Sequence, residues 1–357
     1  MATVIPVRPR TIQGVACPVP LPTHDRVQLG HGSGGKMSAL LLKERFLPRF
    51  GNRYLDALGD GALVPVEGGE VVLSTDTFVV SPLEFPGGNI GHLAVHGTVN
   101  DLAMMGAAPR YLSAGFVLEE GLPFEVLDRI LDAMAGAAAA CGVEVVTGDT
   151  KVVDRGKADG LFVNTTGVGF LHDGFRPSPS RARPGDAVLV SGPLARHGMA
   201  VMAVREGLEF DADIESDTAS LVPLVDALRV AVGDAVHVLR DATRGGLASA
   251  INEIAGASRV GVELSGALPV PSAVEAACEM LGLDPLYVAN EGVLVAFVAP
   301  EAEDAALAAL RSHAVGASAM RVGRVVEDHP GMVVLRTGLG GTRVVDMLPG
   351  DQLPRIC

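Results

Sequence analysis

The sequence contains no apolar run long enough to cross a membrane. Hydrophobic residues make up 48% of its 357 residues, but charged residues interrupt every stretch that approaches the length of a spanning helix. The closest segment, Ala133 to Cys141, follows Asp128, Arg129 and Asp132 in what we predict to be an ordinary helix. The first residues carry scattered arginines and prolines without an apolar core, which excludes a secretory signal. We therefore expect a soluble, cytoplasmic protein with no membrane partner.

The sequence also lacks any run of basic residues. Its formal net charge is −14, and the aromatic residues, at 4%, do not alternate with Lys or Arg in a stripe. Clustered positive charge supplies most of the affinity for nucleic acids, so we expect no nucleic-acid partner. An anionic small molecule is still an acceptable substrate, because the field of one site can differ from that of the whole chain.

Cysteine is scarce. Cys17, Cys141, Cys278 and Cys357 are far apart and form no CxxC pair, and we expect no disulfide framework. Cys141 and Cys278 stand in apolar helical contexts and are predicted to be buried without a chemical role. Cys357 differs, because a residue at the end of a chain is not part of a core by default.

The chain is long enough for two domains, each with its own core. We expect an extended Pro-rich leader over 1–26, an N-terminal domain over 27–172 and a C-terminal domain over 187–345. A stretch rich in Pro, Ser, Gly and Arg, residues 173–186, marks the linker between the domains. Residues 346–357 contain two prolines and no periodicity, which predicts a mobile tail.

Apolar periodicity alternates between strand and helix in both halves, which predicts α/β and α+β architecture. Strands are expected over residues 71–75, 143–147, 161–170, 187–191 and 293–298 and within 322–345. Helices are expected over residues 37–46, 90–105, 124–140, 220–232, 248–255 and 302–314.

The segment Gly30-His31-Gly32-Ser33-Gly34-Gly35-Lys36 is the first with chemical content. Its glycines let main-chain N–H groups approach phosphate oxygens, and Lys36 adds positive charge. The segment matches the dinucleotide pattern GxGxxG, and it matches the P-loop pattern GxxxxGK except for Met37 at the Ser/Thr position. Both motifs need a buried strand upstream, and residues 26–29 are short and half polar. A flexible turn that opens the helix over 37–46 is the alternative, so the segment alone predicts only a phosphate-compatible loop.

Four aspartates in the N-terminal half predict a metal site. Asp60 stands in LGDGA, Asp76 in STDT after an apolar strand, Asp101 in VNDL, and Asp149 in TGDTK after another strand. A single such residue is typically part of a turn or a cap. Several that converge at one sheet edge suit Mg²⁺, which prefers carboxylates together with phosphate oxygens and water. Lys151, close behind Asp149, is placed to neutralise a phosphate.

Three further segments carry weaker signals. His92 and His96 have the helical spacing of a zinc pair, but no HExxH glutamate or nearby cysteine accompanies them, so we expect a packed or solvent-facing pair. Residues 241–246, DATRGG, open a predicted helix where N–H groups and Arg244 can meet an anion. Glu291, in Asn-Glu-Gly before a strand, is either a turn residue or a base that faces the site.

Together these segments resemble one known family. The matching segments are GHGSGGK (30–36), STDTFVVSPLEFPGGNIGHLAVHGTVNDLAMMGA (74–107), GDTKVV (148–153), DATRGGLA (241–248), NEG (290–292) and PRIC (354–357). From about residue 27 to its end, the chain is similar to the HypE family of hydrogenase maturation proteins, the carbamoyl dehydratases. That family shares a superfamily with aminoimidazole ribonucleotide synthetase and selenophosphate synthetase. The superfamily segments imply ATP chemistry, and the PRIC ending separates this family from its relatives.

The resemblance implies a two-domain PurM-like fold, of the aminoimidazole ribonucleotide synthetase type. The strands of an N-terminal α/β domain would pair across a homodimer into a barrel, and a C-terminal α+β domain would follow. ATP would lie between the domains, which replaces the P-loop and dinucleotide interpretations. The implied ATP-binding residues are Gly32, Ser33, Gly34, Gly35, Lys36, Asn100, Thr243 and Arg244, and the implied Mg²⁺ ligands are Asp60, Asp76, Asp101 and Asp149.

The resemblance also implies a reaction. A partner carbamoyltransferase, HypF, would load a carbamoyl group onto the Cys357 thiolate, and the tail would swing the thiocarbamate into the ATP site. Phosphorylation of the carbamoyl oxygen and loss of phosphate would leave a thiocyanate. The cyano group would then pass to iron on a HypC–HypD scaffold for [NiFe]-hydrogenase. Glu291 is the expected base, with His31 second, and Lys151 and the glycine segment would hold phosphates.

Three alternatives remain open from the residues alone. A small-molecule ATP-dependent synthetase or kinase would leave Cys357 incidental, and a nucleotide-binding scaffold would bind ATP without turnover. An NAD-dependent oxidoreductase would rest on GxGxxG, but the Pro-rich leader provides no upstream strand. None of the three explains the PRIC ending.

Overall fold

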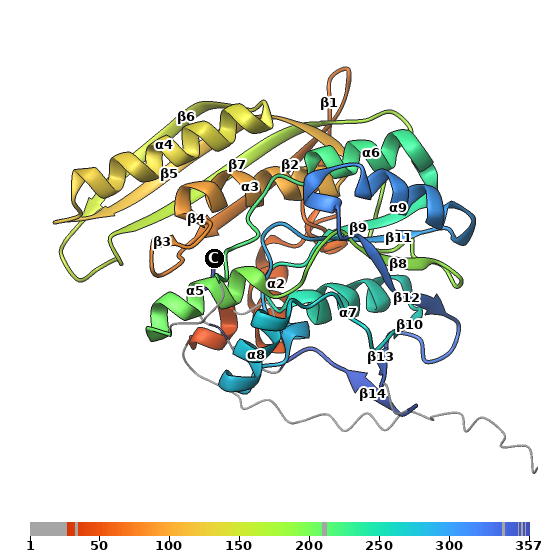
Figure 1. The fold of residues 1–357 in the computed structure, drawn as a ribbon. Coiled ribbons are helices and arrows are strands. Elements are labelled where there is room, and N and C mark those ends of the chain that lie inside the picture. The colour runs from red at the N-terminus through yellow and green to blue at the C-terminus, as the bar shows by residue number, and fades with distance from the viewer. Residues whose placement is uncertain are drawn as a thin grey trace, which may run out of the picture.

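A computed structural model gives the fold of most of the chain. The described residues are 27–32, 35–208, 213–337, 340–348, 350, 353 and 355–357. The predicted leader over 1–26 and the predicted ATP ligands Ser33 and Gly34 lie outside the described residues. The described part forms two large mixed sheets with helices packed against them, in agreement with the prediction of α/β and α+β architecture (Figure 1).

The first large sheet has five strands and comes from the N-terminal half. β5 and β6 run parallel and are joined by the helix α4 (Phe124–Cys141), while the other neighbouring strands are antiparallel. In spatial order the strands are β1 (Ala62–Val66), β2 (Gly69–Phe78), β7 (Leu161–Leu171), β5 (Ala107–Glu119) and β6 (Glu144–Val153). A hairpin of β3 (Glu84–Phe85) and β4 (Gly88–Asn89) follows β2.

The helix α3 (Ile90–Met104) is buried on all sides. It begins at Asn89, whose side-chain oxygen accepts hydrogen bonds from the N–H groups of Gly91 and His92 at 2.9 and 3.2 Å. α3 is apolar around its circumference because it packs on β2 and β7 and also contacts α4 and α6. Its contact with β9 of the second sheet places its C-terminal turn, with Asp101, between the two halves of the chain.

The second large sheet has seven strands, and helices cover both of its faces. Alternate residues of β8 are buried on opposite faces of the sheet. Ala187 and Leu189 pack in the core under α6 (Val222–Val232) and α9 (Glu303–Arg311). Val188 and Val190 pack in the core under α7 (Gly246–Ser258) (Figure 1). In spatial order the strands are β14 (Thr342–Val345), β13 (Val333–Arg336), β10 (Gly261–Leu264), β12 (Met320–Val326), β8 (Ala187–Val190), β11 (Leu294–Val298) and β9 (Val236–Asp241).

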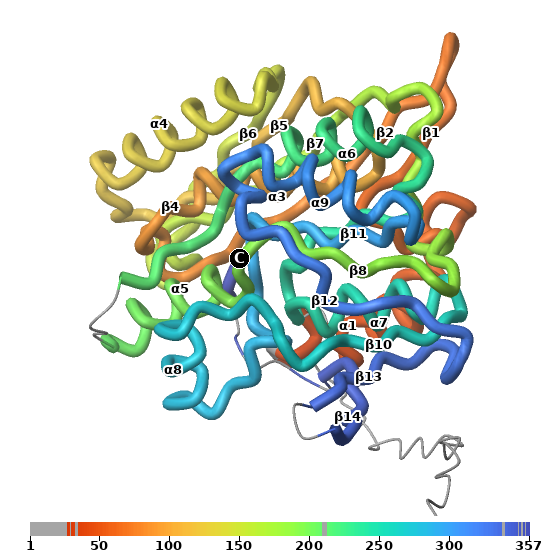
Figure 2. The backbone as a smooth tube through the Cα atoms, turned by 45° about the vertical axis from the view of Figure 1, so that its right-hand side comes forward, coloured from red at the N-terminus to blue at the C-terminus, as the bar shows by residue number. Residues whose placement is uncertain are grey.

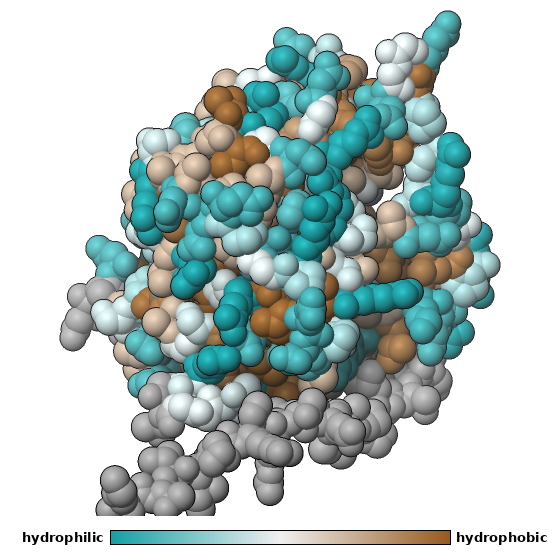
Figure 3. Space-filling view, turned by 90° about the vertical axis from the view of Figure 1, so that its right-hand side faces the viewer, coloured by the Kyte–Doolittle hydropathy of each residue, from teal (hydrophilic) through white to brown (hydrophobic). Residues whose placement is uncertain are grey.

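The helices α5 (Arg196–Glu206) and α8 (Ser272–Leu281) pack in a core that also contains α3 and residues near the end of the chain. The end of the chain lies between α5 and the N-terminal sheet in both views of the backbone (Figures 1 and 2). No helix among the described residues is long and apolar enough to cross a membrane. On the face in Figure 3, hydrophobic side chains form small groups separated by hydrophilic ones.

Every strand and helix expected from the sequence corresponds to an observed element, with shifted bounds. The helix expected over 37–46 is divided into α1 (Lys36–Leu41) and a π-helical turn (Leu42–Phe46), followed by α2 (Leu47–Phe50). Periodicity missed β5, whose alternation is interrupted by Pro109. The other elements that the sequence patterns did not indicate are β1, β3, β4, β9, β10, α2, α5 and α8.

Candidate functional site

Three largely buried carboxyl groups meet where α3 reaches β9. Asp60 precedes β1, Asp101 lies in the last turn of α3, and Asp241 ends β9. One carboxylate oxygen of each residue lies within 4.8 Å of those of the other two. The three residues come from distant parts of the chain, so tertiary folding creates the group.

Burial disfavours the charged form of this group. Loss of hydration raises the pKa of Asp60, and it raises the pKa of Asp241 to about 7 with repulsion from Asp60 in addition. Burial also raises the pKa of Asp101 well above its ordinary value, and repulsion from Asp241 adds to that effect. Arg240 offsets part of the negative charge, because its guanidinium lies 2.5 Å from Asp60 Oδ1 and 2.6 Å from Glu253 Oε2.

The three carboxyl groups fit a divalent cation such as Mg²⁺. They are hard oxygen donors, and their oxygens have the mutual spacing of ligands around one ion. The Ser74 hydroxyl lies 2.6 Å from Asp101 Oδ2 and helps to fix that carboxyl group. A cation between them would relieve the repulsion that, in addition to burial, raises the pKa values of Asp101 and Asp241.

Asp76 lies near this group, within β2 rather than after it. Its register partner on β7 is the buried Thr165, whose hydroxyl bonds to α3, so Asp76 points to the helix-covered face of the sheet. Burial raises the pKa of Asp76, and Arg244 opposes that shift with a guanidinium nitrogen 3.9 Å from Asp76 Oδ1.

Asp149 does not join the other aspartates within one chain. Register pairs Asp149 with Gly115, Gly115 with Asn164, and Asn164 with Thr77. Paired residues share a face and successive residues alternate, so Asp149 lies on the face opposite to Asp76. Three strand spacings, about 14 Å, also separate β6 from β2. The expected convergence of all four aspartates therefore fails for Asp149 in a single chain.

Two adjoining cavities open beside the carboxyl groups. The smaller, of about 220 Å³, has Asp241 and Thr243 in its wall, and the larger, of about 550 Å³, has Cys357 in its wall. Gly32 and Arg244 line both cavities. The larger volume is typical of a small-molecule site.

α7 begins in the wall of the smaller cavity, at Gly246. Gly246 has a φ of +61°, and a Cβ there would lie 2.5 Å from the carbonyl oxygen of Leu286, so only glycine fits. Arg244 donates from Nη1 to the carbonyl oxygen of Gly32 at 3.0 Å and joins the glycine segment to this helix. A helix N-terminus beside a guanidinium favours an anion such as a phosphate. The predicted ligands Gly32, Thr243 and Arg244 therefore meet at one place.

Two other predicted ATP ligands have partners elsewhere. Lys36 forms an ion pair with Asp346. Asn100 is buried, and its amide group donates to the carbonyl oxygen of Ala219 at 3.0 Å and accepts from the Leu221 N–H at 2.7 Å. These bonds tie α3 to the segment before α6, and among the described residues Asn100 lines neither cavity.

The remaining predicted residues divide between the cavities and the surface. His31 lines the smaller cavity and Gly35 the larger one. Lys151 is exposed on β6 and pairs with Asp149. Among described residues 27–35 the chain forms a 3₁₀ turn (Leu29–Gly32) and no strand, so the context that a P-loop or dinucleotide motif requires is missing there.

Cys357 lies in the wall of the larger cavity, so the end of the predicted mobile tail is docked in this structure. A main-chain oxygen of Cys357 accepts a hydrogen bond from the Val79 N–H at 3.1 Å. Burial raises the pKa of the thiol far above its ordinary value, although Arg244 acts in the opposite direction. In this position the sulfur is therefore protonated at neutral pH.

Glu291 is buried close to the same cavity. β9 and β11 pair with Asp241 opposite Leu294, which sets the segment before β11 beside the segment after β9. Burial raises the pKa of Glu291 well above its ordinary value, and repulsion from Asp76 adds to the shift. Its Oε1 is buried and has no hydrogen-bond partner among the described residues. A carboxyl group with these properties is a candidate for proton transfer.

Sequence reasoning missed three residues of this site. Asp241 ends an apolar strand, which is the signal that singled out Asp76, so the pattern was available. Arg240 gives no such signal, because its partner Asp60 is distant in the sequence. Asp217, whose Oδ1 accepts from the Glu291 N–H at 3.1 Å, stands in a loop without periodicity.

Comparisons with known proteins cover both halves of the chain. Residues 58–171 match the family model of the AIR synthase related protein, N-terminal domain, and residues 183–335 match that of the C-terminal domain. Carbamoyl dehydratase HypE of Rhizobium leguminosarum bv. viciae is 54% identical over 333 residues, which are 93% of this chain and 95% of that protein.

Solved structures of similar proteins have the same fold. A HypE–HypF complex contains a chain that is 45% identical, with a TM-score of 0.82 over 86% of this chain and 99% of that one. A hydrogenase maturation protein HypE in complex with ATP is 49% identical, with a TM-score of 0.79 over 92% of this chain and 98% of that one.

Proposed function

Because the chain belongs to the HypE family of carbamoyl dehydratases, within the AIR synthase related proteins, we propose that it serves hydrogenase maturation by making a cyano group on its own Cys357. The reaction consumes ATP and converts an S-carbamoyl group on Cys357 to a thiocyanate. The observation that carries the proposal is the position of Cys357 in the wall of a cavity that Arg244 and the glycine segment also line. A phosphate and a carbamoyl group on sulfur can meet there.

The proposed reaction balances as a dehydration. The carbamoyl oxygen attacks the γ-phosphorus of ATP, the bond from that phosphorus to the β–γ bridging oxygen breaks, and ADP leaves. The phosphorylated oxygen is now a good leaving group, and its bond to carbon breaks as inorganic phosphate departs. The carbamoyl nitrogen loses two protons while the carbon–nitrogen triple bond forms. Sulfur, carbon and nitrogen remain on Cys357.

Glu291 is the proposed base for these protons. Its Oε1 is buried without a hydrogen-bond partner among the described residues, and its pKa is raised by burial, so its carboxylate form is a stronger base than that of an exposed glutamate. His31, in the wall of the smaller cavity, is the second candidate. Arg244 and the N-terminus of α7 are the proposed holders of the phosphates.

The carboxyl groups of Asp60, Asp101 and Asp241 are the proposed holders of Mg²⁺, with Asp76 beside them. Bound there, Mg²⁺ would neutralise negative charge on the transferred phosphate. The fold keeps these carboxyl groups together despite their mutual repulsion. Arg240 reduces that repulsion through its ion pair with Asp60.

We propose that Asp149 and Lys151 contribute to the nucleotide site of a second copy of the chain in a homodimer. Both residues are exposed on β6, and Asp149 lies on the sheet face that its own helices leave uncovered. Tyr111 and Phe170 on the same face are 42% and 46% exposed, as expected of a surface that a partner covers. A second copy, paired along the N-terminal strands, would set these residues against the site of its neighbour.

The proposed partners follow from the chemistry and the relatives. A related HypE chain forms a complex with HypF, which supports HypF as the carbamoyl donor. The proposed cyanide acceptor is the iron held by a HypC–HypD scaffold.

Intact-mass spectrometry tests the proposal. The purified chain is incubated with the carbamoyltransferase and its substrates, and Mg–ATP is then added. We expect the mass of one carbamoyl group to appear and then to fall by one water. Cys357→Ala should abolish both changes, while the control Cys278→Ala should keep them. No adduct while ATP is still hydrolysed would show that Cys357 is incidental and that the substrate is a small molecule.

Glu291→Gln tests the base in the same assay. With the carbamoyl group already loaded, we expect conversion to slow by about 10²- to 10⁴-fold, because a general base typically contributes that much. ATP binding should be retained. Conversion at the wild-type rate would rule out Glu291 and direct attention to His31.

A further inference from the structure

Residues 355–357 are held by their main chain. A main-chain oxygen of each of these residues accepts a hydrogen bond, and the donors are, in order, Arg205 Nη2 at 2.7 Å, His197 Nε2 at 2.8 Å and the Val79 N–H at 3.1 Å. We call these three donors the tail dock. Val79 follows β2 and the other two donors lie on α5, so the tail dock is built from both halves of the chain.

His197 is fixed as a donor. A carbonyl oxygen can only accept, so Nε2 must carry the proton that binds Ile356, and Nδ1 is left to accept from the Ser216 hydroxyl at 2.8 Å. That hydroxyl in turn accepts from the Thr218 N–H at 3.1 Å. Burial lowers the pKa of His197 to about 4, so the ring is neutral at pH 7 and keeps this arrangement.

Arg205 holds the tail and the N-terminal half with one guanidinium group. Its Nη2 donates to the carbonyl oxygen of Arg355 at 2.7 Å and to that of Ser81 at 2.6 Å, and its Nε donates to Ser81 at 2.9 Å. The guanidinium fork is suited to bridging two carbonyl groups in this way. An ammonium group in its place would still donate to these carbonyl groups, although without the fixed geometry of the fork.

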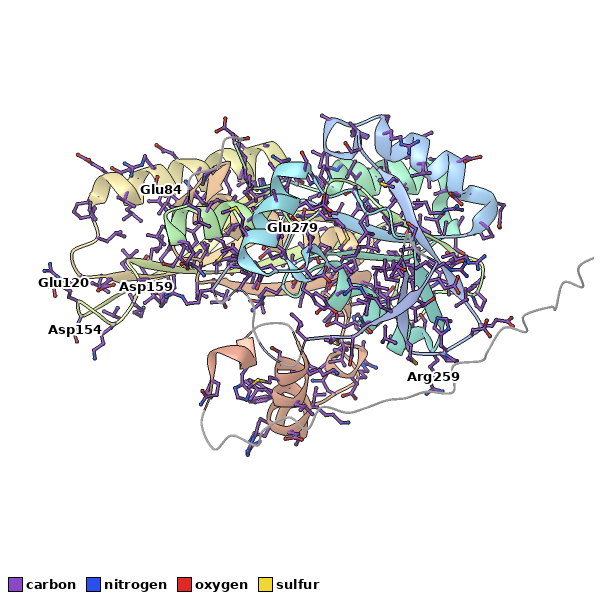
Figure 4. The ribbon with its side chains drawn as sticks, turned by 60° about the horizontal axis from the view of Figure 1, so that its bottom comes forward. Glu84, Glu120, Asp154, Asp159, Arg259 and Glu279 are labelled. Atoms are coloured by element: carbon purple, nitrogen blue, oxygen red, sulfur yellow. The ribbon has the colours of Figure 1, made fainter. Side chains whose placement is uncertain are left out.

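The side chains beside Cys357 anchor the same segment. Ile356 and Leu353 are 3% and 8% exposed and pack in the core that contains α3 and α5. The guanidinium of Arg355 donates to the carbonyl oxygen of Val79 at 3.2 Å and pairs with Asp159, which lies in the loop between β6 and β7 (Figure 4). The binding surface for the tail therefore recognises the residues before the sulfur.

We propose that His197 and Arg205 are positioning residues that hold Cys357 at the cavity through the main chain of the tail, whatever group the sulfur carries. The proposal rests on the proposed function, in which Cys357 is the residue that reacts. The contacts go to main-chain oxygens, so a carbamoyl or cyano group on the sulfur leaves them in place. The equilibrium between the docked and undocked conformations of the tail is then set by His197 and Arg205 on α5 and not by the group that the sulfur carries.

Alkylation of Cys357 by iodoacetamide measures that balance in the full-length protein. The docked thiol is half-buried in the cavity wall and protonated at neutral pH, so it reacts slowly and alkylation proceeds mainly through the undocked fraction. His197→Leu and Arg205→Leu each remove buried hydrogen bonds to carbonyl oxygens, and we expect alkylation of Cys357 to accelerate about tenfold. His197→Gln and Arg205→Lys keep a donor, and we expect them to restore most of the protection. His313→Leu and Arg321→Leu, elsewhere in the C-terminal domain, are the matched controls.

Peptide mapping separates the cysteines and reports the state of the fold. Cys278 is fully buried in the core beside α5, so its alkylation marks unfolding. Acceleration at Cys357 alone, restored by Gln or Lys, supports the proposal. An unchanged rate at Cys357 in both leucine variants overturns it. If a leucine variant exposes Cys278 as well, that variant has lost its fold, and the test passes to the Gln or Lys variant of the same residue. When Cys278 is protected in that variant, the proposal requires Cys357 to be protected too. Rapid alkylation of Cys357 there would overturn the proposal.

A single-turnover experiment adds a readout that lost stability alone would not produce. With a carbamoyl group on Cys357, His197→Leu should lower the rate of conversion about tenfold and leave the ATP concentration for half-maximal rate unchanged. An unchanged rate, or a shift in the ATP dependence alone, overturns the positioning role. The alkylation assay needs neither ATP nor a carbamoyl group, so it tests the tail dock even if the proposed function is wrong.

Discussion

The substitution Asp241→Asn should remove the pH dependence that the buried carboxyl group of Asp241 gives to stability. In the folded chain the pKa of Asp241 is raised to about 7 by burial and by repulsion from Asp60. An aspartate in the unfolded chain ionises near 3.9. The unfolded state therefore holds fewer protons between these values, and the free energy of unfolding falls as pH rises through that window.

The size of the effect follows from the same shift. A pKa raised by about 3 units lowers the free energy of unfolding by about 4 kcal/mol above pH 7. About 3 kcal/mol of this decrease occurs between pH 5 and pH 8. With an unfolding entropy of about 2.1 cal/mol/K per residue, about 3 kcal/mol corresponds to about 4 °C of melting temperature for a chain of 357 residues. We expect the melting temperature of Asp241→Asn, relative to that of the wild type, to be about 4 °C higher at pH 8 than at pH 5.

Melting curves at pH 5, 6, 7 and 8, with and without Mg²⁺, provide the measurement. Mg²⁺ should raise the melting temperature of the wild type more at pH 8 than at pH 5, and it should stabilise Asp241→Asn less. Asp154→Asn is the matched control, because Asp154 lies in the exposed loop between β6 and β7 (Figure 4). Parallel curves for wild type and variant at every pH would refute the reasoning about burial and repulsion. A Mg²⁺ effect of equal size in both proteins would refute the cation site.

Two other substitutions probe the frame around the site. Gly198→Ala would place a Cβ 2.5 Å from Val288 Cγ1 and 3.2 Å from Leu353 Cδ1, so we expect a loss of about 1–3 kcal/mol in thermal unfolding from overpacking. Full stability in that variant would show that α5 can shift to accept the methyl group. Arg240→Ala would leave the buried carboxyl group of Asp60 without its partner, at a cost of about 3–5 kcal/mol. Protonation of Asp60 should reduce this loss at pH 5, and a loss that does not vary with pH would contradict the ion-pair argument.

Local sequence patterns predicted the helices and strands more successfully than they predicted the tertiary contacts between residues. The helix expected over 90–105 is observed as α3, because an apolar segment of that length after a capping Asn89 has few alternatives. β5 was missed, since a strand that contains Pro109 lacks the usual signal.

The aspartates show both the strength and the limit of the prediction of the site. Asp60 and Asp101 were expected to meet, and they do. Asp149 was expected to join them, but strand alternation and the order β2-β7-β5-β6 put it on another face. Sheet order is a property of the whole domain and cannot be deduced from a motif of five residues. Arg240 was missed for the same reason, because its importance depends on which carboxyl groups folding brings to it.

α3 belongs to the cores of both domains. Leu93 packs in the core that contains α4 and α5, while Ala103 and Met104 pack in the core under α6 and α9. A helix shared in this way cannot turn with one domain without leaving the other, so the cleft cannot open by a hinge between the two halves. In the proposed reaction, nucleotide and product would then enter and leave through movements of peripheral segments, of which Gly32, Gly35 and the end of the chain border the larger cavity. Small-angle scattering should accordingly give the same radius of gyration with and without ATP. The two domains would stay fixed relative to each other while the peripheral segments move.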